Sequence, residues 1–228
     1  MKFAFYASNN ATTLKKSLIF ISDNFHDLLG NISFILIDND YNFELRKITE
    51  ELNIKLIELN LENKKKKNKY VSDYLNFLLK ENNTDYLFIY CDKILKGELL
   101  KNYKNRIINF HPSLLPAFKG LNAIDKALKE NAFILGNTAH FIDENIDEGI
   151  ILMQSLLPVL YFKDYYDVID MQVYMLVQLI IWIEEEKLII ENNKSYVKDS
   201  FYTPDFFIPN LENKILISEF KKWIKYKL

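Results

Sequence analysis

Short apolar runs alternate with helix-length segments through the first two thirds of this chain, and this alternation limits the possible folds most. The apolar runs cover residues 3–7, 32–37, 54–59, 86–90 and 107–110. They are nearly continuous in apolar side chains, which is typical of strands covered on both faces. Helices are expected between them, at residues 13–22, 44–52, 71–80 and 98–103. The spacing predicts an α/β fold with a mostly parallel central sheet.

The pattern changes in the last third of the chain. A helix is expected at residues 122–129, followed by two strands close in sequence at 137–142 and 150–157 and by a long helical segment at 163–186. The last forty residues are mixed in character. A length of 228 residues suits one domain with a tail. We therefore expect a main domain over residues 1–190 and a short C-terminal appendage packed on it over residues 191–228.

Composition excludes several classes of protein. Hydrophobic residues make up 49% and charged residues 26%, which excludes a disordered chain. The longest clean apolar run, residues 179–183, is far shorter than the ~20 residues that cross a bilayer. No basic and apolar leader precedes the first strand, so we expect a cytoplasmic protein without a membrane partner. The single cysteine, Cys91, excludes an internal disulfide framework and a cysteine-rich zinc site.

The charge balance speaks against a nucleic-acid partner. The chain carries 29 Lys and Arg against 31 Asp and Glu, a net charge of −2. A domain that binds nucleic acid usually has an excess of positive charge, because it must neutralise phosphates. The one dense basic cluster, residues 64–67, is expected to be a solvated helix start or loop.

Two polar residues stand at the end of the fifth predicted strand. Asn109 and His111 are two residues apart, so their side chains leave the strand on the same face. The carboxyl edge of a parallel sheet is where α/β proteins bind ligands. An amide and an imidazole on one face can hold a carbonyl oxygen as it becomes an oxyanion. A turn-capping Asn and a His bonded to the backbone would explain the same spacing, which leaves both interpretations open.

A second polar segment covers residues 136–149. Thr138 and His140 share one face of a strand, and four carboxylates then crowd a short loop, namely Asp143, Glu144, Asp147 and Glu148. One of them can pair with His111 and tune its protonation. A hard cation would require more oxygen ligands, so we expect no metal. A solvated acidic turn fits this loop equally well when it is considered alone.

Taken together, the two segments resemble the formyltransferases that use 10-formyltetrahydrofolate. The first signature is Asn-x-His-Pro-Ser-Leu-Leu-Pro at residues 109–116. The second follows after some 25 residues and consists of Gly136, Thr138, His140, Phe141 and Asp147. The resemblance covers about residues 2–190 and is strongest at 106–158. It implies a Rossmann-like sheet, a catalytic domain over residues 1–190 and an N-formyltransferase activity.

The resemblance also implies the catalytic roles, with Asn109, His111 and Asp147 as the catalytic residues. An amine attacks the formyl carbon, and negative charge develops on the formyl oxygen. The Asn109 amide and the His111 ring N–H would stabilise that charge in the transition state. Asp147 would keep His111 protonated and help to relay the proton of the amine through water.

The family's cofactor loop follows the fourth strand. In this chain the matching residues are Asp92, Lys93, Ile94 and Leu95. On the other side of the pterin, the resemblance implies Ile142, Asp143 and Glu144. His140 matches a second family histidine near the cofactor, although a structural hydrogen-bonding role suits it better.

The sequence departs from the family in ways that indicate which amine accepts the formyl group. Two members of the family are disfavoured, because a methionyl-tRNA formyltransferase would carry a further RNA-binding domain and a formyltetrahydrofolate deformylase would carry an extra domain ahead of the core. Glycinamide ribonucleotide formyltransferases have a Gly-Asn-Gly-Ser-Asn turn that cradles phosphate, where this chain has Ser-Asn-Asn-Ala-Thr at residues 8–12. Their late helix also carries a substrate-binding Glu, which is missing around Gln172.

These departures lead to an expected acceptor, a nucleotide-linked amino-sugar. The aromatic tail at residues 201–209 is similar to the end of sugar N-formyltransferases. We therefore expect a dTDP-4-amino-4,6-dideoxyhexose, formylated for surface polysaccharide synthesis, and a possible homodimer. The expected substrate contacts are Asn9, Asn10, Thr12 and Gln172. Two alternatives stay open: a phosphoribosylglycinamide formyltransferase of purine synthesis, and a non-catalytic folate- or nucleotide-binding module.

Overall fold

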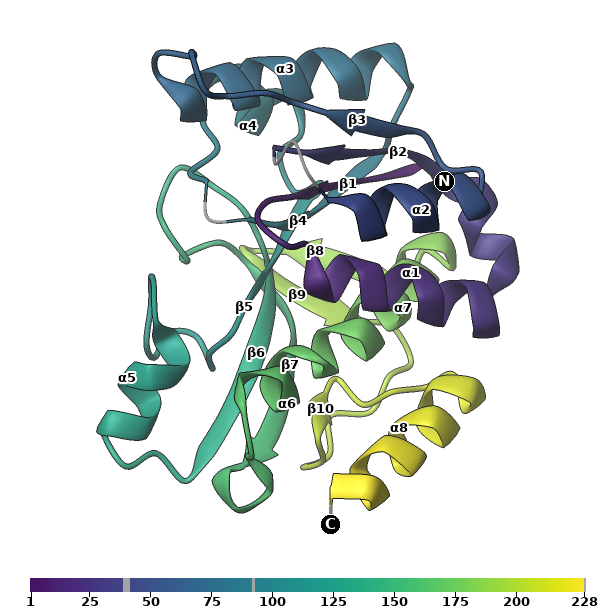
Figure 1. Ribbon diagram of the computed structural model, residues 1–228. Coiled ribbons are helices and arrows are strands. Elements are labelled where there is room, and N and C mark those ends of the chain that lie inside the picture. The colour runs from purple at the N-terminus through teal and green to yellow at the C-terminus, as the bar shows by residue number, and fades with distance from the viewer. Residues whose placement is uncertain (39–41, 92, 228) are drawn as a thin grey trace. The chain divides into compact units, whose positions relative to one another are not determined.

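The structure, a computed structural model, describes residues 1–38, 42–91 and 93–227. The chain forms two compact units, and neither is a single stretch of sequence. The first unit consists of Met1–Asn109 and Phe141–Ile146. The second consists of Phe110–His140 and Asp147–Leu228. Figure 1 labels the elements of both units.

The first unit is built on five parallel strands. In sequence order they are β1 (Phe3–Ala7), β2 (Ile32–Ile37), β3 (Leu56–Glu58), β4 (Tyr86–Tyr90) and β5 (Ile107–His111), whose last two residues belong to the second unit. Their order in the sheet is β3-β2-β1-β4-β5, and every pairing is parallel. The predicted α/β fold with a mostly parallel sheet is therefore confirmed.

Helices cover both faces of this sheet, which explains why its strands are apolar throughout. The helical elements are α1 (Thr12–Asn24), the 3₁₀ helix η1 (His26–Asn31), α2 (Phe43–Glu51), α3 (Lys67–Glu81) and α4 (Glu98–Asn102). In Figure 1, α1 and α2 lie on one face of the sheet and α3 and α4 on the other. All five residues of β1 are buried. Burial on both sides, rather than strand propensity alone, fixes this part of the fold.

The second unit is built on three antiparallel strands. These are β6 (Ile134–Phe141, whose last residue belongs to the first unit), β7 (Ile151–Pro158) and the two-residue β10 (Phe207–Ile208). β7 pairs with both of the others. The remaining elements of this unit are α5 (Ala123–Lys129), η2 (Val159–Tyr161), α6 (Tyr165–Ile169), α7 (Met171–Glu184), the hairpin β8 (Leu188–Glu191) and β9 (Lys194–Val197), and α8 (Lys214–Lys227).

The predicted long helix at 163–186 is split in two. An Asp164 capping box starts α6, and α6 and α7 meet at Asp170, which keeps helical backbone angles. By length and composition alone, the stretch Tyr165–Glu184 would suffice to cross a membrane. However, 83% of its most apolar window is buried inside the structure, which is typical of a core helix.

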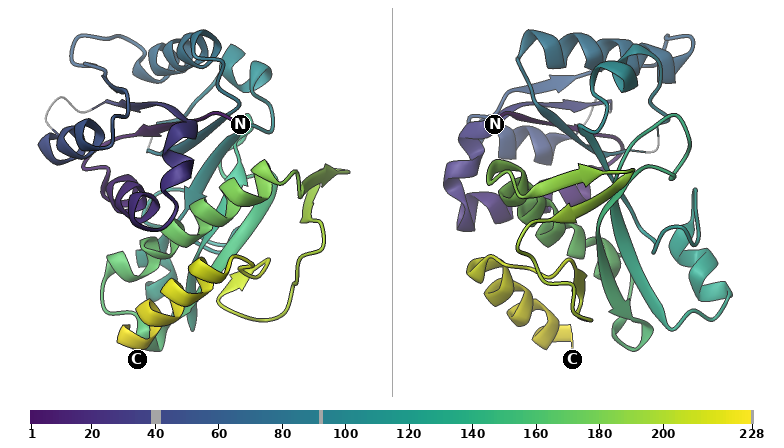
Figure 2. Two further views of the ribbon diagram at one scale, coloured as in Figure 1. Left: turned by 90° about the vertical axis from the view of Figure 1, so that its right-hand side faces the viewer. Right: turned by 180° about the vertical axis from the view of Figure 1, so that it is seen from behind.

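The C-terminal segment is more ordered than its mixed sequence suggests. Phe207 of β10 and Phe220 of α8 have their ring centroids 4.8 Å apart, and Phe220 also lies 5.4 Å from Tyr174 of α7. Figure 2 shows α8 running alongside α7. Residues after 190 therefore pack within the same compact unit as residues 147–190. The predicted domain boundary at 190 stays a prediction.

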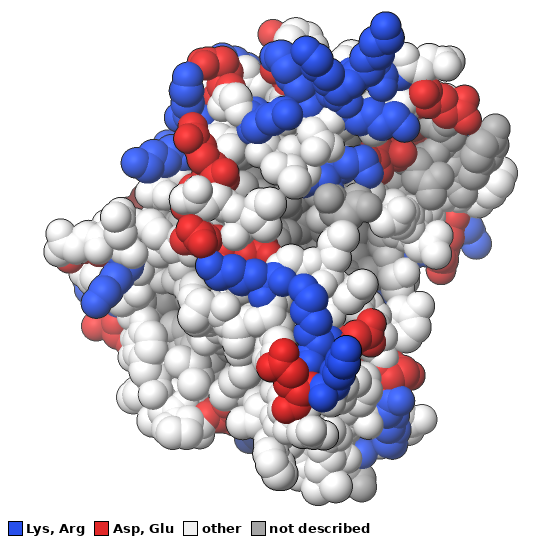
Figure 3. All heavy atoms as spheres, turned by 90° about the vertical axis from the view of Figure 1, so that its left-hand side faces the viewer, with Lys and Arg blue, Asp and Glu red and all other residues white. Residues whose placement is uncertain are grey.

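The lysine run at residues 64–67 lies at the surface of the first unit. All four side chains are exposed, and Lys64 lies 4.5 Å from the centre of the Tyr70 ring. Figure 3 shows Lys and Arg side chains gathered around α3 of the first unit. An exposed helix start with a solvated charge run is what the sequence predicted for this segment.

Candidate active site

The end of β5 carries the two predicted catalytic side chains. Asn109 and His111 are alternate residues of this strand, so they leave it on the same side. Asn109 is half-buried, whereas His111 is buried. After His111 the chain turns into the Pro112–Pro116 stretch, whose Leu115–Pro116 peptide bond is cis.

A buried carboxylate lies against two histidines in the second unit. Oδ2 of Asp147 is 3.5 Å from Nδ1 of His111, and Oδ1 is 3.7 Å from Nε2 of His140. The backbone N–H of Gly120 also donates to Oδ2, at 2.8 Å. The Asp147 side chain is only 10% exposed, so these contacts are shielded from solvent. The loop thus holds one negative charge beside the His111 ring, as the sequence predicted for Asp147.

Both ring nitrogens of His111 face acceptors. Nδ1 faces Asp147, and Nε2 lies 3.1 Å from the backbone oxygen of Phe118. A neutral imidazole has only one N–H, so it can serve only one of these oxygens as a donor. His111 is thus held between the Asp147 carboxylate and a backbone oxygen.

His140 is buried beside the Asp147 carboxylate. It is 2% exposed, and its ring faces Asp147. This position favours the structural role over direct contact with a cofactor.

The loop after His111 is braced by residues of β6 and β7. Thr138 donates to the backbone oxygen of Ser113 at 2.7 Å and accepts from the Leu115 N–H at 3.0 Å. Gln154 donates to Thr138 Oγ1 at 2.9 Å and to the Leu115 oxygen at 3.0 Å. Gln154 was not predicted from sequence. It reaches the loop because it faces Thr138 across the β6–β7 ladder, and only the register reveals that pairing.

Of the predicted cofactor loop after β4, three residues are described, and Asp92 lies outside the described residues. Leu95 is buried in the core of the first unit, whereas Ile94 is half exposed. The Lys93 ammonium lies 3.4 Å from the Asp38 carboxylate, which also accepts a hydrogen bond from Tyr6. Lys93 is thus held by the protein itself.

The second predicted cofactor segment belongs to the same unit. Ile142 packs against the core that buries Leu95, and its N–H donates to Ile107 of β5. Asp143 accepts a hydrogen bond from the N–H of Asn145, which shapes the turn, and Glu144 is exposed. Ile94 and Glu144 are thus exposed at the surface of the first unit, and Ile142 is half-buried.

The turn between β1 and α1 adopts an unusual backbone for its sequence. Asn9 and Ala11 both have positive φ, at 55° and 47°, which is the left-handed region. Thr12 begins α1, and its N-cap residue, Ala11, provides no side-chain cap. Asn10 accepts a hydrogen bond from Asn42 through its backbone oxygen. The geometry that glycines would provide is therefore present without them.

Gln172, the fourth predicted acceptor contact, is hydrogen-bonded inside the second unit. It is 4% exposed, and its amide donates to Asn137 Oδ1 at 2.8 Å. Asn137 in turn donates to Ser155 and to the backbone oxygen of Val168. Gln172 is thus part of an internal network of the second unit, and we do not carry it into the acceptor site.

The described residues include no cluster of metal ligands. Across residues 1–38, 42–91 and 93–227, no three His, Cys, Asp or Glu side chains come together in a way that would hold a metal ion.

Comparisons with known proteins bear on this arrangement. Phosphoribosylglycinamide formyltransferase of Haemophilus influenzae is 32% identical over 110 residues, which are 46% of this chain and 51% of that enzyme. The formyltetrahydrofolate deformylase of the same organism is 43% identical over 67 residues, or 29% of this chain and 24% of that enzyme. The human trifunctional purine biosynthetic protein adenosine-3 is 42% identical over 67 residues, 29% of this chain and 7% of its own length. The matched parts thus span about half of these relatives or less.

Solved structures support the fold. Glycinamide ribonucleotide transformylase 1 from Symbiobacterium toebii superposes with a TM-score of 0.72 at 22% identity, covering 87% of this chain and 94% of that one. The sequence pattern that defines the formyl transferase family matches residues 1–173. With three quarters of its length matched, this chain belongs to the formyl transferase family.

Proposed function

We propose that this protein is an N-formyltransferase that moves a formyl group from 10-formyltetrahydrofolate to an amine. The observation that carries the proposal is the contact between the Asp147 carboxylate and Nδ1 of His111. His111 lies on the same strand as Asn109. The family membership agrees with it. The folate supplies an activated formyl carbon, and Ile94, Ile142 and Glu144 are the residues we propose to hold its ring system.

The residues of the chain account for the charge that develops during transfer. The nitrogen of the amine forms a bond to the formyl carbon, and the bond from that carbon to the folate nitrogen breaks. Between these events the formyl oxygen carries negative charge. The Asn109 amide donates to it, and His111 donates through Nε2 after leaving the Phe118 oxygen.

Asp147 is the residue that we propose to relay a proton from the attacking amine to the departing folate nitrogen. The attacking amine must lose a proton, and the departing folate nitrogen must gain one. A carboxylate held by Gly120 and next to the His111 ring can pass that proton by way of water.

For the acceptor, the relatives favour glycinamide ribonucleotide over an amino-sugar nucleotide. The Haemophilus influenzae relative is a phosphoribosylglycinamide formyltransferase, and the expected amino-sugar acceptor is not confirmed. The β1–α1 turn adds support, because it has left-handed residues at positions 9 and 11 and because its N-cap residue, Ala11, provides no side-chain cap for the N–H groups that begin α1. Such N–H groups attract a phosphate. Asn9, Asn10 and Thr12 are the residues that we propose to surround it.

One observation keeps the dTDP-amino-sugar as the second candidate. Phe201 is 70% exposed and Tyr202 is 50% exposed, so they offer aromatic surface to a nucleobase. By contrast, Phe206 and Phe207 pack on Phe220 of α8 and are not available for stacking. A homodimer and a cytoplasmic location also stay proposals.

A panel of amines tests the function. The full chain is incubated with 10-formyltetrahydrofolate and either glycinamide ribonucleotide or dTDP-4-amino-4,6-dideoxyglucose, and products are followed by mass spectrometry. We expect formylation of glycinamide ribonucleotide with the higher kcat/KM, and loss of turnover in His111→Ala. A higher kcat/KM for the sugar nucleotide would instead establish the second candidate. Folate binding without turnover of either amine would support the non-catalytic binding module and overturn the proposal.

A further inference from the structure

A shielded ion pair connects two segments of the first unit that leave the carboxyl edge of its parallel strands. Asp38 comes directly after β2, and Lys93 belongs to the segment after β4. β1 lies between these two strands in the sheet. The Lys93 ammonium is 3.4 Å from Oδ2 of Asp38, so the pair reaches across the end of β1. This edge is where α/β proteins bind ligands.

The carboxylate of Asp38 is fixed by a residue of β1. The Tyr6 hydroxyl donates to the same Oδ2 atom at 2.8 Å, and Tyr6 is fully buried. The Asp38 side chain is 3% exposed and that of Lys93 is 24% exposed. Water and salt therefore screen this ion pair less than they screen a pair at the open surface, and Tyr6 keeps one end of it in place.

The segment that follows the ion pair is held at its other end as well. Leu95 is buried in the core of the first unit, and the N–H of Lys96 donates to Ser72 Oγ of α3 at 3.0 Å. Ile94 lies between these contacts and the ion pair, and it is 50% exposed. The chain on both sides of Ile94 is thus attached to the rest of the unit, while the Ile94 side chain is accessible.

We propose that Asp38 is a positioning residue for folate binding. This inference rests on the proposed function, in which Ile94 is one of the residues that hold the folate ring system. Asp38 acts through Lys93, whose ammonium it fixes one residue before Ile94. A contact that keeps a binding segment in its bound arrangement lowers the entropy cost of binding. Loss of the Asp38 charge therefore weakens folate binding, while kcat at saturating folate stays within threefold of the parent value.

Calorimetric titration of the full chain with 10-formyltetrahydrofolate, without an amine, tests the proposal. Asp38→Asn keeps an oxygen that can accept from Tyr6 but removes the charge that attracts Lys93, and its Kd should rise at least tenfold. Lys93→Met, at a more accessible position, should raise the Kd to a similar extent, and it replaces the buried variant if that one does not fold. Lys93→Arg restores a cation and should return the Kd to within threefold of the parent value.

The double variant separates an indirect role of Asp38 from a direct one. If Asp38 acts through Lys93, then Asp38→Asn combined with Lys93→Met should bind the folate about as weakly as either single variant, because the two residues share one interaction. Effects on the Kd that multiply would show two independent contacts and would overturn the proposal.

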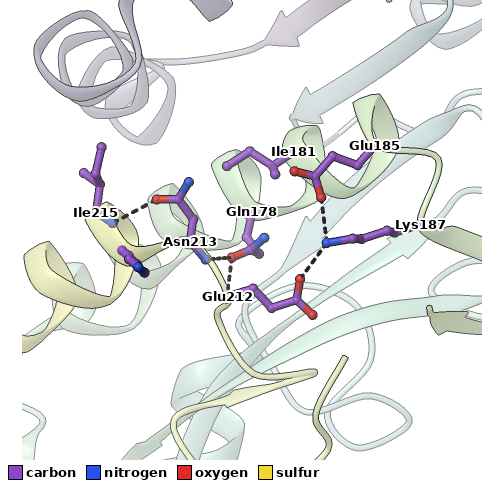
Figure 4. A pocket seen from close by; sticks show the side chains of 8 residues that line it. Gln178, Ile181, Glu185, Lys187, Glu212, Asn213 and Ile215 are labelled. Atoms are coloured by element: carbon purple, nitrogen blue, oxygen red, sulfur yellow. Dashed lines mark hydrogen bonds and ion pairs between the residues drawn. The ribbon is translucent and has the colours of Figure 1, made fainter. Parts of the chain in front are cut away.

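Lys187→Met is the matched control. The Lys187 ammonium lies 3.3 Å from Glu212 in the second unit, and its side chain is 32% exposed, so the distance and the exposure are close to those of Lys93 (Figure 4). This variant therefore loses a comparable ion pair that has no part in the segment after β4. Its Kd for the folate should stay within twofold of the parent value.

Limited proteolysis gives a readout that does not depend on the folate. Trypsin cleavage after Lys93, followed by mass spectrometry, should be at least threefold faster in Asp38→Asn than in the parent, because the segment opens more often. Unchanged cleavage overturns the proposal, and so does an unchanged Kd in Asp38→Asn or in Lys93→Met. A parent that does not bind the folate overturns both proposals, whereas formyl transfer that fails with folate binding intact contradicts only the proposed function.

Discussion

Asp147 has a positive φ of 55°, which few residues other than glycine adopt. That conformation places its carboxylate where Gly120, His111 and His140 all approach it. The strained backbone of this one residue and the electrostatics of the proposed site therefore have the same origin. A side chain that kept the shape but lost the charge would separate the two contributions.

Asp147→Asn makes that separation. The amide oxygen can still accept from Gly120, so the loop should stay folded, but the negative charge beside His111 is gone. We expect kcat to fall by roughly 10²–10⁴ with a circular dichroism spectrum unchanged. Glu148→Gln is the control, because Glu148 is exposed and pairs with Lys119 instead. Near-parental turnover in Asp147→Asn would remove this residue from the mechanism.

Ala11 is a second strained residue, with φ at 47°. Ala11→Gly should release about 1–2 kcal/mol of left-handed strain. It also loses a buried methyl group worth about 0.8 kcal/mol, so we expect the variant to be up to about 1 kcal/mol more stable. Ala127→Gly, at a buried position inside α5, should instead lose about 1 kcal/mol. Urea unfolding of both variants measures the difference; equal losses would show that Ala11 is not strained.

At the scale of secondary structure, the pairing of β6 with β7 positions the side chains that hold the loop after His111. Thr138 and Gln154 face each other in its register and together hold the backbone of the loop after His111. α6 and α8 are linked in a similar way, since the Lys227 ammonium at the end of α8 pairs with the fully buried Asp167 of α6. In both cases one polar side chain connects distant parts of the second unit.

Gln154→Leu tests the first of these links. The variant leaves the Leu115 oxygen without its donor, and the loop after His111 should loosen. We expect a tenfold lower kcat, equivalent to about 1.4 kcal/mol, and a stability loss of about 1–3 kcal/mol. Gln172→Leu breaks an internal hydrogen bond of the same unit and should lower stability while kcat stays within threefold. If both variants lower kcat alike, the loop has no special dependence on Gln154.

The Asp167–Lys227 pair predicts a dependence of stability on pH. Burial alone would raise the pKa of Asp167, but hydrogen bonds from Lys227 and from the N–H groups of Lys163 and Asp164 outweigh it and hold the pKa below its usual value. The folded-state pKa is therefore lower than the unfolded value of about 4. Its stabilising contribution is present above pH 4 and is lost as the pH falls through the folded-state pKa.

Lys227→Met removes the ammonium and keeps most of the stem. It should destabilise the protein by roughly 3–5 kcal/mol at pH 7, because a buried carboxylate loses its partner. The free energy of unfolding should also change less between pH 5 and pH 3 than in the parent. Lys225→Met, an exposed position of the same helix, is the control. Parallel pH profiles for Lys227→Met and the parent would contradict the pairing.

At the scale of the whole molecule, the C-terminal residues are integral to the second unit. Phe207 and Phe220 pack on Tyr174 of α7, and Trp182 donates to Glu212. Truncation after Glu191 would therefore expose the buried face of α7. We expect the shortened chain to lose cooperative unfolding and near-ultraviolet circular dichroism. A truncated chain that unfolded like the parent would show that the C-terminal segment is a separable appendage.

The sequence predicted the first unit well because burial on both faces leaves an unmistakable apolar run. β1, β2 and β4 have the bounds that were expected, while β3 is shorter because only Leu56–Glu58 pairs. The C-terminal elements were missed, although Leu216, Phe220 and Ile224 repeat every four residues and mark the buried face of α8. Asn192 and Asn193, both with positive φ, form the β8–β9 turn and were also available as a signal.

The site was predictable only where chemistry and sequence coincide. The spacing of Asn109 and His111 on one strand placed both residues on the same side, and the contact of Asp147 with His111 is as expected. Gln154 could not be found this way, since its role depends on strand register. Gln172 was selected for its place in the sequence, whereas its surroundings in three dimensions bury it against Asn137. Loops such as residues 8–12 are harder still, because Ala11 adopts angles that its side chain disfavours.

The discontinuous make-up of the two units has a consequence for biosynthesis. The chain passes between the units three times, after residues 109, 140 and 146. A ribosome releases the N-terminus first, so Phe141–Ile146, the last piece of the first unit, emerges only after residues 110–140 of the second. The first unit therefore cannot be completed until residues 110–140 of the second unit have been translated. For the same reason, no single cut in the gene can separate one unit from the other.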